Sequence, residues 1–165
     1  MRSTVLLTVA VLVLTASVLT AAALAASQGG AVVKVDQSTV GRVLVDSHGK
    51  TLYMWAHDKS GRSTCYGTCA TYWPPLTTAG KPIARSGAKS GLLGTTRRSD
   101  GRLQVTYRRH PLYRFILDKK PGQAKGEGLT DFGGRWDPLN AAGKAVRTAT
   151  PGPGYGSLAP FPIAP

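Results

Sequence analysis

Acidic residues are scarce in this chain, which has eight Asp and Glu against 21 Lys and Arg and a formal net charge of +13. An excess of positive charge favours anionic partners such as cell-wall polymers and membrane headgroups, although it also serves simply to keep a domain soluble. The basic residues form scattered pairs, such as Arg97-Arg98 and Lys119-Lys120, and no long run. Because the aromatic residues follow the apolar pattern and do not alternate with a basic stripe, we expect no specific nucleic-acid interface.

Recognisable catalytic signatures are lacking as well. Neither Gly-x-Ser-x-Gly nor His-Glu-x-x-His occurs, which excludes the common patterns of serine hydrolases and zinc proteases. His48 and His110 lie in expected turns, and neither has a nearby acid and nucleophile with which it would act as a general base. We therefore expect a protein that is not an enzyme and that has no resident cofactor.

Cysteine is limited to one closely spaced pair, Cys65 and Cys69. Outside the cytoplasm two such cysteines usually oxidise to a disulfide, which is the pairing we expect. The alternative is a copper or redox site that adds His57 and Met54, because thiolate, imidazole and thioether ligands together suit copper. The spacing differs from that of covalent haem attachment, and no second cysteine pair completes a zinc site.

The first 26 residues have the pattern of a secretory signal peptide. An apolar stretch from Val5 to Leu19 is followed by small residues that suit cleavage near Ala25 or Ala26. The alternative is an uncleaved anchor, because the apolar residues just suffice to span a bilayer as a helix. No cysteine lies near this boundary, so we do not expect a lipid anchor on an N-terminal Cys. The pattern predicts a secreted protein or one of the extracytoplasmic cell envelope.

Residues 32–147 have the size of one ordinary domain, which we expect to be monomeric. Residues 148–165 are rich in Pro and Gly, a composition that predicts a disordered tail.

The domain contains an internal repeat. Gly41-Arg42-Val43 returns as Gly101-Arg102-Leu103 at an offset of sixty residues. Further matching strings are Leu52-Tyr53-Met54-Trp55 with Leu112-Tyr113-Arg114-Phe115, and Trp73-Pro74-Pro75-Leu76 with Trp136-Asp137-Pro138-Leu139. Self-similarity at a fixed offset indicates a duplicated unit, with copy one at about 41–77 and copy two at about 101–140.

Strand signals dominate, and helical periodicity is scarce. Residues 103–107 alternate apolar and polar side chains, which is typical of a half-buried strand, and 112–117 continue as its partner. Residues 43–45 and 51–55 flank a Gly-containing turn, the corresponding hairpin of copy one. We expect a mainly β domain made of two duplicated β-hairpin repeats, with a short helical turn near Cys69 and a disordered C-terminal tail.

A repeated Tyr-x-aromatic-x-x-Asp motif carries most of the candidate binding residues. They are Tyr53, Trp55 and Asp58 in copy one, and Tyr113, Phe115 and Asp118, together with Tyr107 and His110, in copy two. In one interpretation the aromatic rings are core, and each Asp accepts hydrogen bonds from the turn that follows it. In the other, each Tyr hydroxyl pairs with an Asp carboxylate in a ligand cleft between the copies. Burial of the carboxylates distinguishes the two.

Three longer strings carry a family resemblance. They are Thr51-Leu52-Tyr53-x-Trp55-x-x-Asp58, Ser63-Thr64-Cys65-x-Gly67-x-Cys69-Ala70-x-x-Trp73-Pro74-Pro75-Leu76 and Gln104-Val105-Thr106-Tyr107-x-x-His110-Pro111-Leu112-Tyr113. The chain resembles, over about residues 32–143, the bacterial secreted-repeat family of unknown function, which is described as predicted lipoproteins with this Tyr-x-aromatic-x-x-Asp motif. The resemblance implies an extracytoplasmic, duplicated small domain and no activity that can be transferred. The lack of a lipidatable N-terminal Cys favours free secretion over lipid tethering.

The function that we expect is that of a non-enzymatic envelope or secreted binding module. Its cationic surface would bind anionic cell-wall polymers or membrane headgroups. The alternative is a copper-binding or redox accessory protein that uses Cys65 and Cys69, with His57 and Met54 as further ligands.

Overall fold

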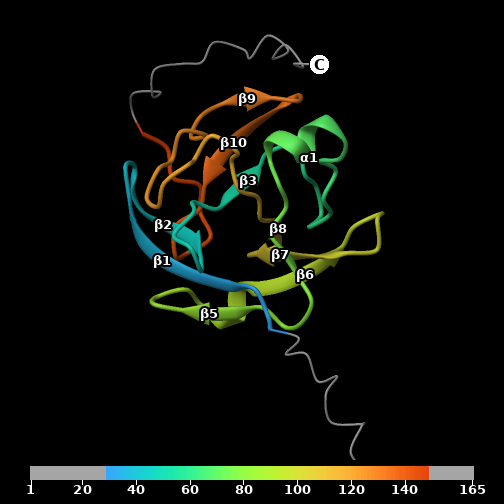
Figure 1. Ribbon diagram of the computed structural model, residues 1–165, viewed down its shortest axis with the longest axis horizontal. Coiled ribbons are helices and arrows are strands. Elements are labelled where there is room, and N and C mark those ends of the chain that lie inside the picture. Colours follow the sequence, from blue (N-terminus) through green and yellow to red (C-terminus); the bar gives the residue numbers. More distant parts are fainter. Residues whose placement is uncertain (1–28, 149–165) are drawn as a thin grey trace, which may run out of the picture.

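The computed structural model describes residues 29–148, and the fold is mainly β (Figure 1). The predicted signal peptide, residues 1–26, lies outside the described residues, as does all but the first residue of the predicted tail, 148–165. In chain order the elements are β1 (Val32–Ser38), β2 (Gly41–Asp46), β3 (Tyr53–Trp55), α1 (Thr68–Tyr72), β4 (Thr77–Thr78), β5 (Ile83–Arg85), the 3-10 turn η1 (Ser90–Leu92), β6 (Leu93–Arg97), β7 (Leu103–Tyr107), β8 (His110–Pro111), β9 (Thr130–Asp131) and β10 (Gly134–Pro138). The mainly β prediction, with one short helix near Cys69, is confirmed.

Each copy begins with a hairpin, β1 with β2 and β6 with β7, both antiparallel. The turn of each hairpin contains a glycine with a positive φ, 101° at Gly41 and 82° at Gly101. A Cβ at either position would meet nothing within 4 Å. Glycine is therefore required by the left-handed backbone of the turn and not by crowding. This requirement accounts for the glycine of the repeated Gly-Arg pair.

Three small sheets are built around these hairpins. β5 adds to β1 in parallel and gives the order β2-β1-β5. In the second sheet β7 is the central strand: it pairs with β6, with β4 and with β8. The third sheet has the order β3-β10-β9 and joins the two copies, because β3 belongs to copy one and β10 to copy two.

The two copies meet at Tyr53 and Tyr113, which face each other in antiparallel register. The Tyr53 N–H donates to the Tyr113 carbonyl at 2.8 Å, and the Tyr113 N–H donates to the Tyr53 carbonyl at 3.0 Å. Beyond this bridge, Pro138 of copy two pairs with Tyr53, and Pro75 of copy one pairs with Tyr113. The Trp-x-Pro-Leu string of each copy therefore lies beside the tyrosine segment of the other, and the copies are crossed.

The leucine at the end of each Trp-x-Pro-Leu string continues the exchange. Leu76 of copy one donates its N–H to the Leu112 carbonyl at 2.9 Å and accepts the Val105 N–H at 2.8 Å. Leu139 of copy two packs against copy one, and its N–H donates to the Leu52 carbonyl at 3.3 Å. Both leucines are buried. Each copy thus completes the hydrophobic core of the other.

The predicted partners of the tyrosine segments are wrong. The turn after β2 forms, and Val45 bridges to Thr51 as expected. The chain then leaves β2, and β3 pairs instead with β10, with Trp55 opposite Trp136. Residues 112–117 are likewise no continuous strand. The local hairpins extend as far as Leu52 and Leu112, whose N–H groups donate to the Leu44 and Val105 carbonyls. Beyond them the segments pair across the copies, where the aromatic side chains of both are buried.

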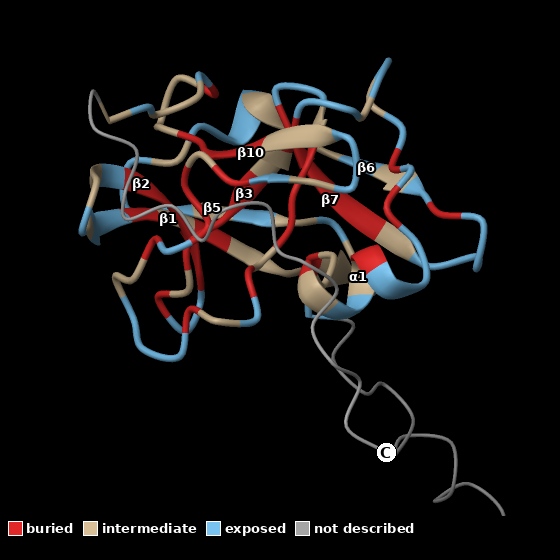
Figure 2. Cartoon of the chain, turned by 90° about the horizontal axis from the view of Figure 1, so that it is seen from above, coloured by how far each residue is buried: buried red, intermediate tan, exposed pale blue. Residues whose placement is uncertain are grey.

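Buried residues form two clusters inside a shell of exposed turns (Figure 2). The first cluster consists of Val33, Val35, Leu44, Leu52, Leu76, Val105, Tyr107, Leu112 and Leu139. The second consists of Tyr53, Trp55, Cys65, Cys69, Trp73, Tyr113, Phe115, Leu129 and Trp136. Among residues 29–148, no helix combines the length and the apolar character needed to cross a membrane.

Candidate functional site

The repeated motif builds two crossed tyrosine–carboxylate pairs. The hydroxyl of Tyr53 in copy one donates to Oδ2 of Asp118 in copy two at 2.6 Å. The hydroxyl of Tyr113 in copy two donates to Oδ2 of Asp58 in copy one, also at 2.6 Å. Both tyrosine side chains are fully buried. The four polar residues of the motif therefore lie at the junction of the copies, and each pair contains one residue from each copy.

The second oxygen of each carboxylate stabilises the turn that follows it. Asp118 Oδ1 accepts the Lys125 N–H at 2.9 Å, and Asp58 Oδ1 accepts both the N–H and the hydroxyl of Thr64 at 2.8 Å. Asp118 is buried and Asp58 half-buried. Each interpretation of the motif thus describes part of the arrangement: the tyrosine–carboxylate pairs exist, and they are part of the core.

Burial changes the acid–base properties of these four groups. Removal from water raises the pKa of Asp58 and of Asp118, although the hydrogen bond from the tyrosine acts in the opposite direction. Burial, followed by the charge of its carboxylate partner, also raises the pKa of Tyr53 and of Tyr113. A phenol with a raised pKa beside a carboxylate with a raised pKa holds its proton firmly but has a base directly beside it.

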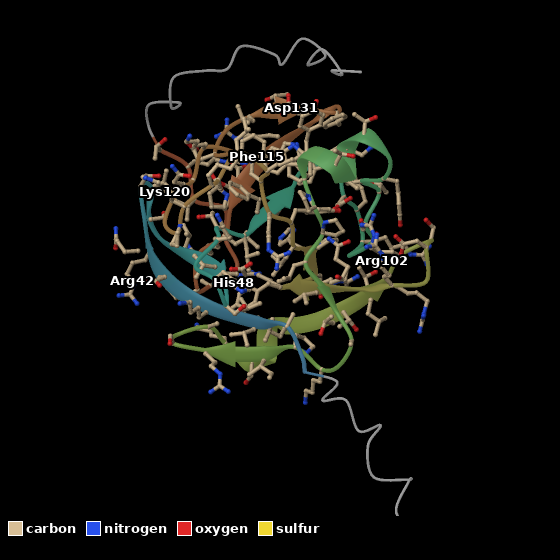
Figure 3. The ribbon with its side chains drawn as sticks, viewed as in Figure 1. Arg42, His48, Arg102, Phe115, Lys120 and Asp131 are labelled. Carbon is tan, nitrogen blue, oxygen red and sulfur yellow. A yellow bond between two sulfur atoms is a disulfide. The ribbon has the colours of Figure 1, made fainter. Side chains whose placement is uncertain are left out.

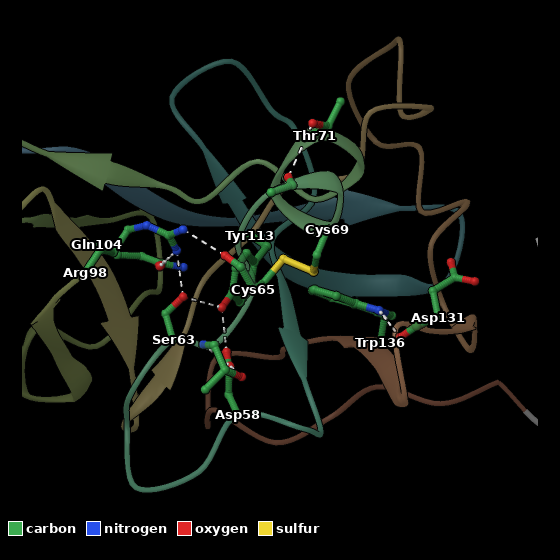
Figure 4. The surroundings of a disulfide bond; sticks show 12 residues. Asp58, Ser63, Cys65, Cys69, Thr71, Arg98, Gln104, Tyr113, Asp131 and Trp136 are labelled. Carbon is green, nitrogen blue, oxygen red and sulfur yellow. Dashed lines mark hydrogen bonds between the residues drawn. A yellow bond between two sulfur atoms is a disulfide. The ribbon is translucent and has the colours of Figure 1, made fainter. Parts of the chain in front are cut away.

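A line of polar side chains extends from Tyr113 towards a buried arginine (Figure 4). The Ser63 hydroxyl lies 2.8 Å from the Tyr113 hydroxyl. Arg98 donates to Ser63 Oγ at 2.6 Å, to Gln104 Oε1 at 2.7 Å and to the Cys65 carbonyl at 2.7 Å. Arg98 is only 2% exposed; these hydrogen bonds solvate its guanidinium group inside the protein, and Asp100 Oδ2, 3.5 Å from Arg98 Nε, supplies the opposite charge.

Sequence reasoning missed this arginine and its partners. Gln104 was expected to face solvent, as the polar half of an alternating strand, but it is fully buried, and Thr106 is buried as well. The strand β7 lies inside its sheet, and the side chain of Gln104 is covered as well, because it accepts a hydrogen bond from Arg98 and donates one to the Leu112 carbonyl. Arg98 follows Arg97 in the sequence, and nothing local distinguishes the buried arginine from the exposed one.

Stacked aromatic rings fill the space between the two tyrosines. Trp73 lies parallel to Trp136, with ring centroids 3.9 Å apart and an angle of 3°. Trp136 in turn stacks on Trp55 at 5.1 Å and 8°. Phe115 covers the other face of Trp73 at 4.3 Å, and His57 covers Trp55 at 4.7 Å. We call these five rings, Phe115–Trp73–Trp136–Trp55–His57, the aromatic column; His57 is its exposed end.

Cys65 and Cys69 form the predicted disulfide, with a Cα–Cα distance of 5.3 Å. The thiolate pair required by the copper alternative is therefore oxidised. Met54 packs against the first cluster, whereas both cysteines lie in the second; alternation along β3 directs Met54 away from them. His57 stacks on Trp55. Within residues 29–148, no three His, Cys, Asp or Glu side chains are arranged to hold a metal ion.

The two remaining candidates lie outside the aromatic column. Tyr107 belongs to the first cluster, where its hydroxyl accepts the Lys89 N–H and donates to the Ala141 carbonyl, each at 2.8 Å. His110 is half-buried in β8. Burial, and then the charge of Arg108, lowers the pKa of His110 below its ordinary value. The hydroxyl of Tyr107 thus joins two segments inside the first cluster, and the lowered pKa of His110 favours its neutral form.

The charges of the protein are segregated. The exposed carboxylates are those of Asp36 and Asp100, and the other acidic residues are buried or half-buried. The exposed cations are Arg42, Lys59, Arg62, Lys81, Arg85, Lys89, Arg97, Arg102, Arg108, Arg109, Lys119, Lys120, Lys125, Lys144 and Arg147. They lie on more than one side of the molecule, as Arg42 and Lys120 on one side and Arg102 on the other show (Figure 3).

One basic hollow of about 270 Å³ lies where the loop after β3 meets β6 and β7. Its lining includes Ser60, Arg62, Thr95, Thr96, Thr106 and Arg109. It therefore presents two guanidinium groups and several hydroxyls and no carboxylate. Within the described part of the chain, no carboxylate forms an ion pair with either arginine.

Comparison with known proteins accounts for the duplication. No curated protein and no solved structure matches the chain. A family model does match it twice, at residues 34–77 and 94–140, and these ranges contain nearly all of the two hairpins, the tyrosine segments and the Trp-x-Pro-Leu strings. The matched family is a lipoprotein family described as a secreted repeat of unknown function. The chain belongs to this family of secreted repeats and carries two copies of the repeat.

Proposed function

We propose that the protein is a non-enzymatic binding module of the cell envelope or the secreted fraction, and that its ligands are anionic wall polymers or anionic membrane headgroups. The segregation of charge carries this proposal. Most acidic residues are internal, where they pair with tyrosines, arginines and backbone N–H groups, so the exposed charges are almost all positive. Such a surface attracts polyanions through the summed field of many charges.

The basic hollow is the place where we expect an anionic group to bind most tightly. Planar guanidinium groups bind phosphate oxygens with two hydrogen bonds, and threonine hydroxyls add further donors. Arg62 and Arg109 both line the hollow, and Thr106 holds a fixed position in β7. A phosphate or carboxylate group of a polymer repeat would fit this set of donors.

The experiment is a sedimentation assay with insoluble cell-wall fragments, with vesicles of anionic lipid, and with vesicles of neutral lipid. We expect binding to one or both anionic materials and none to neutral vesicles. Added salt should release the protein, because exposed charges are screened over about 8–10 Å at moderate ionic strength. Salt-resistant binding, equal binding to neutral vesicles or no binding at all would contradict the proposal.

A matched pair of double variants tests the hollow. Arg62→Ala with Arg109→Ala removes two charges from the hollow, and Arg42→Ala with Lys120→Ala removes two charges elsewhere on the surface (Figure 3). We expect the first variant to lose more affinity than the second at the same salt concentration. Equal losses would assign the binding to overall charge and would remove the hollow from the proposal.

A further inference from the structure

The aromatic column is a continuous path of rings from the core to the surface. Its three indoles are stacked nearly parallel, and Trp73 and Trp136 are fully buried. At one end the exposed His57 ring covers Trp55. An indole loses an electron more readily than a phenol that keeps its proton, and overlapping rings share the resulting positive charge. The column therefore has the composition and the geometry of an electron-transfer path.

Each buried tyrosine of the motif touches this column edge-on. Tyr53 meets Trp73 with ring centroids 5.3 Å apart, and Tyr113 meets Trp136 at 5.2 Å. Each hydroxyl donates at 2.6 Å to a carboxylate. A phenol that loses an electron becomes strongly acidic and must release its proton, so a base within hydrogen-bond distance makes the loss possible in a buried site.

Packing alone does not explain the column. Aromatic pairs favour offset or edge-to-face arrangements with centroids about 4.5–7 Å apart, whereas Trp73 and Trp136 overlap more closely, at 3.9 Å. The indole N–H groups of Trp55 and Trp73 are also buried and have no hydrogen-bond partner among the described residues. Buried donors without partners call for a specific reason. An oxidised indole that has no proton acceptor keeps its proton and passes the positive charge on.

We propose that the protein is a one-electron relay, in which the aromatic column connects the surface at His57, which covers the buried Trp55, with the two crossed tyrosine–carboxylate pairs. A diffusible one-electron oxidant takes one electron from Trp55 and is itself reduced. An electron from Trp136 then reduces the oxidised Trp55, and an electron from Trp73 reduces the oxidised Trp136. Tyr53 or Tyr113 finally gives up one electron, and its phenolic proton passes to Oδ2 of the partner carboxylate.

The products of this sequence balance. They are one neutral tyrosyl radical, one protonated aspartic acid and one reduced oxidant. When an external one-electron reductant refills the column, the proton returns from the carboxyl group to the phenolate oxygen. The relay is independent of the anion-binding function proposed above, because none of its rings or carboxylates lines the basic hollow.

Flash photolysis tests the relay. The oxidant is tris(bipyridine)ruthenium(III), which a laser flash generates from the ruthenium(II) complex in the presence of a quencher. In the unchanged protein we expect the absorption of an indolyl radical to convert into that of a tyrosyl radical, at a rate independent of protein concentration. Tyr53→Phe combined with Tyr113→Phe keeps both rings and removes both hydroxyls, so the concentration-independent conversion should be lost. Tyr107→Phe is the matched control, because this buried tyrosine has no carboxylate partner and lies in the first cluster; the conversion should persist.

Circular dichroism establishes that each variant is folded. Asp58→Asn combined with Asp118→Asn provides a second test that leaves every ring in place. An amide is a far weaker base than a carboxylate, so the conversion should slow severalfold while the indolyl radical still forms. Conversion that persists unchanged in either double variant, or that depends on protein concentration in the unchanged protein, would overturn the proposal.

Discussion

At the scale of single residues, the two aspartates of the motif determine how the junction of the copies responds to pH. Asp118 is buried and Asp58 half-buried, and each accepts a hydrogen bond from a tyrosine of the other copy. A carboxylate in such a place is less hydrated than it is in the unfolded chain. The folded state therefore retains the proton of each carboxyl group to a higher pH than the unfolded state does.

The consequence for stability has a definite sign. Burial raises the pKa of Asp58, so in the window between its unfolded and folded pKa values the folded protein binds more protons, and stability falls as the pH rises through that window. In Asp58→Asn the side chain stays neutral. We therefore expect the free energy of unfolding of this variant, relative to the unchanged protein, to increase from about pH 4 to about pH 7. Urea unfolding at several pH values measures the difference.

Asp100 is the control with the opposite sign. Hydrogen bonding to Arg102 lowers the pKa of Asp100 to about 2, so its contribution to stability is present above the unfolded pKa and is lost as the pH falls. Asp100→Asn should lose stability relative to the unchanged protein as the pH rises from about 2 to about 4, and the difference should stay constant at higher pH. A flat difference for Asp58→Asn, or one with the sign found for Asp100→Asn, would show that burial does not dominate the pKa of Asp58.

At the scale of elements, α1 depends on its surroundings. It has five residues, its N-cap is Gly67, and no side chain caps it. A helix this short is not stable on its own. The disulfide between Cys65 and Cys69 joins the residues before the helix to its second residue, and the chain then enters the aromatic column at Trp73. The cross-link thus fixes the start of the helix, and through it the position of Trp73 in the aromatic column.

Replacing both cysteines tests this role. Cys65→Ser combined with Cys69→Ser should lower the free energy of unfolding by about 2 kcal/mol, because the loop closed by the disulfide is short. Thermal unfolding measures the loss, and the unchanged protein treated with a reducing agent should show a similar one. Binding to anionic wall fragments should persist. A variant as stable as the unchanged protein, or one that no longer binds, would contradict a purely structural disulfide.

The elements also show how far the sequence leads. Residues 103–107 form a strand as predicted, since their alternation is a local property, and the short helix near Cys69 follows from the prolines after Trp73. The partner of β3 was not predictable, because β10 lies about eighty residues away and no local pattern specifies it. The motif singled out the tyrosines and aspartates that lie at the junction of the copies, but a comparison of the two copies cannot show that their pairs are crossed.

At the scale of the whole molecule, neither copy is a folding unit. Leu76 of copy one lies between Leu112 and Val105 of copy two, and β3 of copy one pairs with β10 of copy two. Each half of the chain therefore lacks part of its own core when it is alone. Because each half depends on the other for part of its core, we expect the domain to unfold as one cooperative unit, as small single domains usually do.

Cutting the chain tests this interdependence. We expect residues 29–88 and residues 89–148, produced separately, to be unfolded, because each exposes tyrosine and leucine positions that the other half covers. Mixed in equal amounts, they should associate and regain the near-ultraviolet circular dichroism of the intact protein. A half that folds cooperatively by itself would contradict the crossed arrangement. The intact chain cut after it has folded serves as the control for the effect of the break.

The reciprocal hydrogen bonds between Tyr53 and Tyr113 have a further consequence. Two segments that contact each other through the same residues in opposite directions form an isologous interface, the kind that relates the subunits of a symmetric dimer. A polypeptide with a single repeat would reach this fold by associating with a second molecule of itself. The junction of the duplicated chain has the arrangement of such a dimer joined into one polypeptide, and the joining allows the halves to differ: the disulfide and the buried Arg98 each occur in one half alone.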